Sequence, residues 1–269
     1  MNPLDAIWLG VIEGLTEFLP VSSTGHLILL GELLGTSGEA AKAIDIVIQL
    51  GAILAAAVYF RATLLELARG LVRREPASLR LTGVLLAAFI PTAIVGLLAH
   101  HWIEAHLFGP IPVAAALIVG GVVMIAVDIA RRRTGRLGVE GLERATLRTG
   151  LIVGLAQCLA LWPGASRSMV TIVAGQLCGL RTKTAAELSF LLAIPTLGAA
   201  TVFDFAKSYR EIGAVPNGML TVAVGLAVSF VVAWLVIAAF LRYLSRFGLG
   251  PFGWYRIALG ALVLVLALR

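Results

Sequence analysis

Two short polar segments interrupt an otherwise apolar chain, and they hold its most reactive side chains. The first spans residues 13–26 and the second spans residues 162–171. Together they contain two carboxylates, an imidazole, a guanidinium and several hydroxyls, framed by proline and glycine. Ionisable groups at membrane depth are energetically costly, and they usually face the interior of a helix bundle or a wet cavity. We therefore expect these two segments to form the functional site.

Glu13 and Glu17 are four residues apart, a spacing that places two side chains on one face of a helix. Two carboxylates this close repel each other, which favours the binding of a divalent cation between them. Mg²⁺ in particular is usually held by one or two carboxylates together with substrate phosphates, and Ca²⁺ has similar preferences. The sequence predicts a Mg²⁺ or Ca²⁺ site at this pair. The alternative is that they cap a helix or pair with a basic side chain, for which Arg167 is the candidate.

Hydroxyl residues follow the break at Pro20, where a new helix is expected to begin. Ser22, Ser23 and Thr24 can cap that helix, and we expect at least one of them to do only this. A helix N-terminus with free N–H groups also binds anions. His26 lies within one turn of it, which suits general acid or base catalysis.

The second segment repeats this arrangement with a cation in place of the carboxylates. Gly164 allows a tight turn, and Arg167 lies where the next helix is expected to begin. Arginine binds phosphate bidentately and keeps its charge when buried. The hydroxyls of Ser166, Ser168 and Thr171 can add donors. If the two segments meet, the combination suits phosphoryl transfer, because a cation and an arginine neutralise charge while a base or nucleophile attacks.

Composition identifies the environment of these segments. The 269-residue chain is 59% hydrophobic and 13% charged, with a mean hydropathy of +0.98, whereas a soluble domain is about a quarter charged. The sequence pI of about 9.9 could suggest a nucleic-acid partner. The basic residues lie at the ends of apolar stretches, however, so we interpret them as topology signals and expect no nucleic-acid binding. The sequence indicates an integral membrane protein whose partner is the bilayer.

Apolar stretches long enough to cross a bilayer define the expected architecture. We predict six transmembrane helices, near residues 43–60, 81–99, 112–130, 185–203, 218–241 and 254–268. Two further apolar regions, about 3–35 and 148–180, are broken by proline and glycine, and each half is too short to cross alone. We expect both to form re-entrant helical hairpins, since irregular backbone is tolerated where protein or water satisfies it. The fold class is therefore an all-α polytopic membrane protein.

Arginines indicate the orientation of these helices. They follow the first and third spans, precede the fourth, and include Arg242, Arg246 and Arg256 between the fifth and sixth, so the positive-inside rule makes this side cytoplasmic. The hairpins then enter from opposite faces, which predicts inverted repeats at about 1–135 and 145–269 in a single membrane domain, residues 1–269. Weak similarity of residues 14–19 to residues 154–159 supports this pairing.

Motif order and length now point to a family. Glu13-x-x-x-Glu17, followed by Pro-Val-Ser-Ser-Thr-Gly-His26 and later by Pro163-Gly-Ala-Ser-Arg-Ser-x-x-Thr171, resembles the bacterial undecaprenyl-diphosphate phosphatases, also called bacitracin-resistance proteins. The resemblance covers essentially the whole chain, and both motifs are intact. It implies hydrolysis of undecaprenyl diphosphate to the monophosphate, which recycles the lipid carrier of cell-wall synthesis. It also implies a divalent cation and a site that opens outward from the bacterial cytoplasmic membrane.

The resemblance carries the family's active-site roles onto matching positions. By that match, the active-site residues are Glu13, Glu17, Ser23, His26, Ser166, Arg167 and Thr171. Combining this match with the residue chemistry, we predict catalytic roles for Glu17, Ser23, His26 and Arg167. We predict substrate contacts from Ser22, Thr24, Gly164, Ser166, Ser168 and Thr171, and metal ligation by Glu13 and Glu17.

Several alternatives stay open. Lipid phosphatases of the phosphatidic-acid type need a second histidine after their Ser-Arg motif, and this chain has none after His106. The attacking group is then Ser23 or a water molecule. Inverted repeats with broken helices are also typical of transporters, so a lipid-phosphate transporter or flippase is the competing function. The oligomeric state, including a homodimer, is not decided by the sequence.

Overall fold

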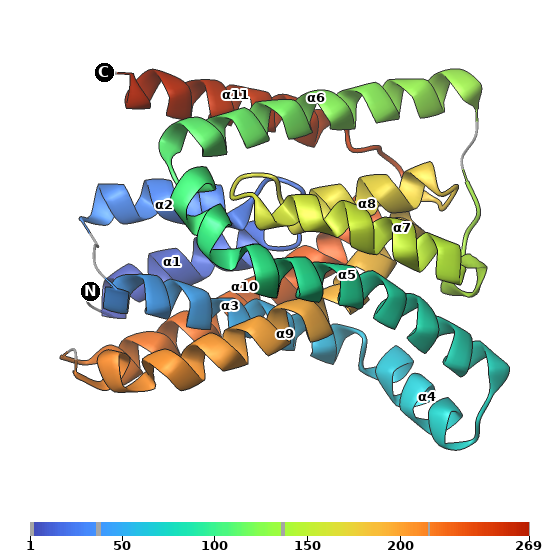
Figure 1. Cartoon of the computed structure of the whole chain (residues 1–269), viewed down its shortest axis with the longest axis horizontal. Coiled ribbons are helices and arrows are strands. Elements are labelled where there is room, and N and C mark those ends of the chain that lie inside the picture. Colours follow the sequence, from blue (N-terminus) through green and yellow to red (C-terminus); the bar gives the residue numbers. More distant parts are fainter. Residues whose placement is uncertain (1–2, 36–38, 136–137, 215, 269) are drawn as a thin grey trace. The chain divides into compact units, whose positions relative to one another are not determined.

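The computed structural model of the chain is all-helical, and it describes residues 3–35, 39–135, 138–214 and 216–268 (Figure 1). The α-helices are α1 (Pro3–Thr16), α2 (Ser23–Leu34), α3 (Glu39–Tyr59), α4 (Arg61–Val72), α5 (Pro76–Leu107), α6 (Pro110–Thr134), α7 (Leu147–Gln157), α8 (Arg167–Leu177), α9 (Thr182–Ala214), α10 (Gly218–Leu244) and α11 (Gly250–Ala267). Two short 3₁₀ turns, η1 (Leu142–Arg144) and η2 (Cys158–Leu161), complete the elements. Within these ranges no strand forms, and β-type pairing is limited to a bridge between Val139 and Leu180.

Five of these helices are long and apolar enough to cross a membrane. They are α5, α6, α9, α10 and α11, and a sixth crossing results if α3 and α4, which are separated by a sharp bend, form one span. The prediction of an all-helical, multi-pass membrane protein is confirmed. The two regions predicted as hairpins each consist of short helices, α1 and α2 in one and α7 and α8 in the other, joined by non-helical residues.

The chain folds into two compact units, and each draws on both halves of the sequence. The first unit consists of Met1–Leu19, Ser23–Arg61 and Ala193–Phe240. The second unit consists of Pro20–Ser22, Ala62–Leu192 and Leu241–Arg269. The three residues at the turn of the first hairpin thus belong to the second unit, while the helices on both sides of that turn belong to the first.

In the first unit, α1 packs against α2 and α3 around an apolar cluster that includes Leu9, Ile44 and Ile48. Close packing of α1 on α10 depends on glycine. A Cβ atom on Gly14 would lie 2.8 Å from the carbonyl oxygen of Ser229, closer than van der Waals contact allows. Small residues at helix interfaces in membranes allow such backbone contact.

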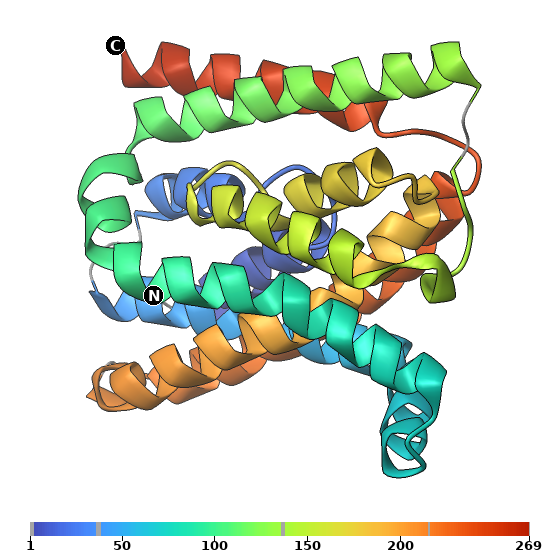
Figure 2. The ribbon, with the colours of Figure 1, turned by 45° about the vertical axis from the view of Figure 1, so that its right-hand side comes forward.

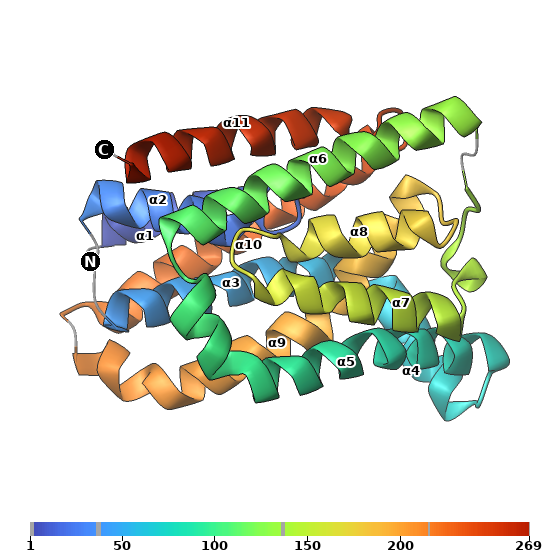
Figure 3. The same ribbon diagram turned by 45° about the horizontal axis from the view of Figure 1, so that its top comes forward.

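In the second unit, α6 and α11 run side by side, which Figures 2 and 3 show from two directions. The helices α7 and α8 form an antiparallel pair, and α7 also packs along α5. A glycine again permits the contact, because a Cβ on Gly154 would lie 2.5 Å from the carbonyl oxygen of Ala88. Gly14 and Gly154 are the positions that the weak similarity of the two halves aligns, so both first helices of the hairpins pack through an equivalent glycine.

Several elements differ from their predicted bounds. The basic connection after the first predicted span is helical, as α4. The helix predicted at 81–99 spans Pro76–Leu107 as α5, and in it His106 stacks on Trp102 one turn earlier. The last helix begins at Gly250 instead of residue 254, because Pro251 is well suited to the first turn of a helix. This last difference concerns the functional site.

Candidate active site

The carboxylate pair lies at the end of α1, in the first unit. The helix stops at Thr16, but the backbone N–H of Glu17 still donates to the carbonyl oxygen of Glu13 at 2.9 Å, so the helical spacing extends through Glu17. Both side chains are buried, with Glu13 0% and Glu17 6% exposed. Two buried carboxylates on consecutive turns match the predicted cation site in kind and spacing.

Ser23 begins α2 and faces this pair across the turn. Its hydroxyl Oγ donates to Glu17 Oε2 at 2.7 Å. The same carboxylate oxygen accepts a hydrogen bond from Gln49 Nε2 of α3 at 3.2 Å, and Thr201 of α9 donates to the Gln49 Oε1 atom at 3.4 Å. Glu17 is therefore held in place from α3 while it accepts the hydrogen bond of Ser23. A hydroxyl bound to a buried carboxylate is the arrangement of a nucleophile with its base.

Gln49 was not predicted as a site residue. Its position on the first predicted span, four residues after Asp45, gave no direct signal, because only the fold brings α3 beside the end of α1. The remaining predicted residues of the first motif lie in the first turn of α2, where Thr24 is exposed and His26 is half-buried.

Each hairpin turn ends in a serine with an unusual backbone. Ser22 has φ of 73° immediately before α2, and Ser166 has φ of 70° immediately before α8. A positive φ is uncommon for a residue other than glycine, and such strained residues cluster at functional sites. Ser166 also caps α8, since its Oγ accepts from the backbone N–H of Met169 at 3.3 Å and lies 3.1 Å from the Ser168 hydroxyl. The two turns therefore end in the same backbone conformation, a serine with positive φ directly before a helix.

Arg167 is the first residue of α8, in the second unit, and only 9% of it is exposed. Its Nη1 atom donates to the carbonyl oxygen of Ser189 at 2.8 Å and contacts the Ser189 hydroxyl at 3.3 Å. Thr171 lies beneath it, with its hydroxyl 2.7 Å from the Ser189 Oγ and 2.7 Å from the Arg167 carbonyl oxygen. Thr171 and Ser189 thus fix the orientation of the guanidinium.

Arg256 holds the two hairpin turns together, and like Gln49 it was not predicted as a site residue. It is fully buried in α11, at 0% exposure. Its Nη2 atom donates to the carbonyl oxygens of Gly164 at 2.9 Å, Ala165 at 3.1 Å and Ala116 at 3.0 Å, and its Nη1 donates to that of Pro20 at 3.3 Å. All of these residues belong to the second unit. One guanidinium therefore binds the turn of the first hairpin and the turn of the second.

Arg256 was predicted to lie among the cytoplasmic charges, and the structure corrects this prediction. A helix that begins at Gly250 places Arg256 in its second turn, among buried neighbours. One signal was available, since Arg256 is the only charged residue between positions 250 and 268.

Gly164, which accepts a hydrogen bond from Arg256, must be a glycine at this close contact. Its φ is 93°, and a Cβ there would lie 2.6 Å from the carbonyl oxygen of Val113.

Replacing Arg256 by alanine is expected to remove donors from four buried carbonyl oxygens. Each unsatisfied group costs about 1–3 kcal/mol, so the unfolding temperature in detergent should fall. The Arg256→Lys protein keeps the charge but cannot reach all four acceptors, and we expect it to fold with a turnover reduced about tenfold, since lysine lacks the planar fork of arginine. Arg246→Lys, at an exposed position, is the control. Wild-type stability and turnover in both Arg256 variants would contradict this role.

The carboxylates satisfy part of a cation's requirements. In the part of the chain that the structure describes, no three His, Cys, Asp or Glu side chains gather into a complete metal cage. Glu13 and Glu17 supply two oxygen ligands, which is what Mg²⁺ commonly takes from a protein when substrate phosphates supply others. The donor set therefore fits a hard cation that binds together with a phosphorylated substrate.

Comparison with known proteins places this arrangement in a family. Residues 6–262 match the family described as "Bacitracin resistance protein BacA". The chain belongs to the BacA family. An undecaprenyl-diphosphatase of Sorangium cellulosum is 66% identical to it over 97% of this chain and 85% of the relative. An undecaprenyl-diphosphatase of Sphingopyxis alaskensis is 46% identical over 94% of both chains. An undecaprenyl-diphosphatase 2 of Shewanella oneidensis is 41% identical over 97% of this chain and 96% of the relative. The BacA resemblance drawn from the motifs is confirmed.

Proposed function

We propose that this BacA-family protein hydrolyses undecaprenyl diphosphate to undecaprenyl phosphate and inorganic phosphate. The observation that carries the chemistry is the 2.7 Å hydrogen bond from the Ser23 hydroxyl to the buried Glu17 carboxylate. The names of the relatives give the reaction, and the family gives its link to bacitracin resistance. Regeneration of the lipid monophosphate returns the carrier to cell-wall synthesis.

In the proposed first step, Ser23 Oγ attacks the terminal phosphorus while Glu17 accepts the hydroxyl proton. The bond between that phosphorus and the bridging oxygen breaks, and undecaprenyl phosphate leaves with a proton supplied by His26. Water then loses a proton to the neutral His26 and attacks the phosphorus of the serine phosphate ester. Glu17 returns its proton to Ser23 Oγ as the ester bond breaks, which releases inorganic phosphate and restores the Ser23 hydroxyl. Gln49 supports Glu17 by donating to the oxygen that faces Ser23.

Arg167 is proposed to bind the non-bridging oxygens of the diphosphate. Negative charge spreads over these oxygens in the transition state of phosphoryl transfer, so a fixed guanidinium stabilises it. The hydroxyls of Ser166, Ser168 and the exposed Thr24 are proposed to donate further hydrogen bonds to the diphosphate. The turns that contain Ser22 and Gly164 leave space for it. A buried hydroxyl network through Thr171 and Ser189 keeps the guanidinium from turning away.

We propose that the turns of both motifs, residues 20–22 and 164–166 of the second unit, bind one diphosphate. Support comes from the turn of the first hairpin, Pro20–Ser22, which shares the Arg256 guanidinium with Gly164 and Ala165. Ser23 follows that turn directly in the chain, and Arg167 follows the other turn within two residues. The paired glycines and the paired positive-φ serines likewise support inverted repeats, with six spans and two re-entrant hairpins.

A divalent cation, Mg²⁺ or Ca²⁺, is proposed to bind at Glu13 and Glu17 together with diphosphate oxygens. Bound there, it would neutralise charge on the substrate. The arginine-rich segments after the first and third predicted spans support a cytoplasmic location for that side, so the site opens outward from the bacterial inner membrane.

Purified protein in detergent is expected to release inorganic phosphate from undecaprenyl diphosphate, and EDTA is expected to abolish most of that release. Detergent removes the second compartment that a transporter requires, so release there distinguishes hydrolysis from transport. Adding back Mg²⁺ or Ca²⁺ should restore the rate. A well-folded wild-type protein that releases no phosphate with either cation would contradict the proposed function. Full activity after exhaustive chelation would contradict the cation site alone.

A further inference from the structure

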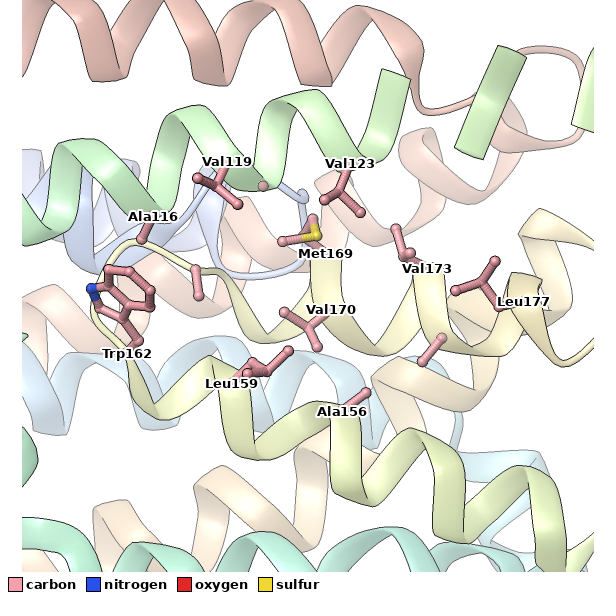
Figure 4. Close-up of a pocket in the computed structure, with 13 residues that line it drawn as sticks. Ala116, Val119, Val123, Ala156, Leu159, Trp162, Met169, Val170, Val173 and Leu177 are labelled. Carbon is pink, nitrogen blue, oxygen red and sulfur yellow. The ribbon is translucent and has the colours of Figure 1, made fainter. Parts of the chain in front are cut away.

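An apolar groove of about 320 Å³ lies within the second unit, between α6, α7 and α8 (Figure 4). Trp162 and Ala116 lie at one end of it and Leu177 at the other, with the side chains of Met169 and Val170 between them. Only apolar carbon and sulfur side chains line it, apart from the indole of Trp162. The groove is therefore suited to hydrocarbon and not to a charged head group.

Small residues create this space. Ala116 and Gly120 of α6, Ala156 of α7 and Ala174 of α8 line the groove where larger side chains would fill it. Its rim is exposed: Val119 is 58% exposed, Leu159 63% and Leu177 70%. The floor, which includes Val173, is buried. In a membrane-spanning unit, a hollow with a buried floor and an exposed rim is open to a chain that enters along the surface.

The groove starts at the turn before α8. Ala165 lines the groove, donates its backbone N–H to the carbonyl oxygen of Trp162 at 3.0 Å, and closely precedes Arg167. Along α8, Arg167 and Thr171 point to Ser189, whereas Met169, Val170 and Val173 line the groove, so the two functions lie on different faces of one helix. At about 1.5 Å per residue, the stretch from Ala165 to Leu177 extends roughly 18 Å away from the turn.

We propose that this groove binds the polyprenyl chain of the substrate, with the isoprene unit next to the diphosphate at the Trp162 end and later units towards Leu177. The proposal rests on the proposed function. A diphosphate held by Arg167 is covalently joined to a long hydrocarbon chain, which must leave the turn along an apolar path. The groove is continuous with that turn and lacks polar side chains that would reject the chain. The distal part of the chain extends beyond Leu177 into the bilayer.

Tryptophan substitutions along the groove test this placement. Val123→Trp fills the groove from its α6 rim, and Leu177→Trp narrows its far end. Val122→Trp is the matched control, because Val122 is the neighbouring residue on α6, 53% exposed, and does not line the groove. Substrates are undecaprenyl diphosphate and a water-soluble five-carbon prenyl diphosphate, with thermal unfolding measured for each protein.

We expect Val123→Trp to raise KM for undecaprenyl diphosphate about tenfold, since the displaced chain loses contact with apolar surface. Its kcat, and its activity on the five-carbon compound, should stay near wild type, and Val122→Trp should change neither. Leu177→Trp, at a highly exposed site that should tolerate the change, is expected to raise KM for the long chain only. Equal KM values in the groove variants and the control would overturn the proposal.

A binding measurement separates this inference from the proposed function. An undecaprenyl diphosphate with a diazirine in its chain should label peptides of α6 and α8 in the wild-type protein, and unlabelled substrate should compete. Labelling there without any phosphate release would contradict the proposed function and leave the groove assignment standing. Normal release with labelling confined to other helices would overturn the groove assignment alone. So would labelling by a diazirine phospholipid that the prenyl diphosphate cannot displace.

Discussion

Ser23→Ala protein is expected to release phosphate with kcat lowered by about a millionfold, the scale seen when the nucleophile of a serine hydrolase is removed. The physical reason is that this variant loses the proposed attacking oxygen, while Glu17, Gln49 and the residues proposed to bind phosphate keep their places. Phosphate release at saturating undecaprenyl diphosphate measures kcat directly. Ser245→Ala, which removes an exposed hydroxyl elsewhere, is the control and should behave as wild type.

Two companion measurements sharpen this test. Rapid acid quenching with substrate labelled at the terminal phosphorus should trap label on wild-type protein and none on Ser23→Ala. Because Ser23 and Glu17 act as a unit through their 2.7 Å hydrogen bond, the Glu17→Gln, Ser23→Ala double variant should be little slower than the worse single variant. Near-full turnover in Ser23→Ala would instead identify water as the attacking group.

The second large effect is expected at Arg167. Arg167→Ala should lower kcat/KM by about a thousandfold, in line with the loss of a fixed donor to developing charge. Arg167→Lys keeps the positive charge as a point charge without the bidentate fork, so it should recover only part of the loss. Initial rates at low substrate concentration measure kcat/KM. Arg148→Ala, an exposed arginine of the same unit, is the control.

Ser189 allows a separate test of how Arg167 is held. Ser189→Ala removes the hydroxyl that contacts both Thr171 and the Arg167 Nη1 atom, but it leaves the Ser189 carbonyl acceptor in place. We expect a drop in kcat of about tenfold, corresponding to loss of a hydrogen bond worth roughly 1–1.5 kcal/mol. For the preceding test, wild-type kinetics in Arg167→Ala would contradict any role of the Arg167 guanidinium in the proposed reaction.

Local physics explains which features the sequence could predict. Helical hydrogen bonds join residues four apart, so long apolar stretches predicted α5, α6, α9 and α10 with errors confined to their ends. Breaks at Pro20 and Pro163–Gly164 are likewise local, since proline removes a donor and glycine permits a positive φ. The spacing of Glu13 and Glu17 required only that α1 be helical to its end. Residue type, spacing and breaks were thus available in the sequence.

The two turns resemble each other in backbone more than in sequence. Pairing their prolines, Pro20 and Pro163, places Ser22 opposite Ala165, whereas the residues with positive φ directly before a helix are Ser22 and Ser166. The second hairpin has the 3₁₀ turn η2 after its first helix, but its turn still ends in a serine with positive φ. The backbone conformation of a strained residue depends on its tertiary contacts, and a comparison of amino-acid types does not contain that information.

By itself, the sequence determined the membrane class, the helical architecture, the family and the two motifs, because each follows from residue type or from spacing within one element. Tertiary structure alone decided that Gln49 and Ser23 share an oxygen of Glu17, that Ser189 orients Arg167, and that Arg256 holds both hairpin turns. These contacts join residues up to 236 positions apart. A side chain's partner in such a contact depends on how helices pack, and no local pattern in the chain encodes that packing.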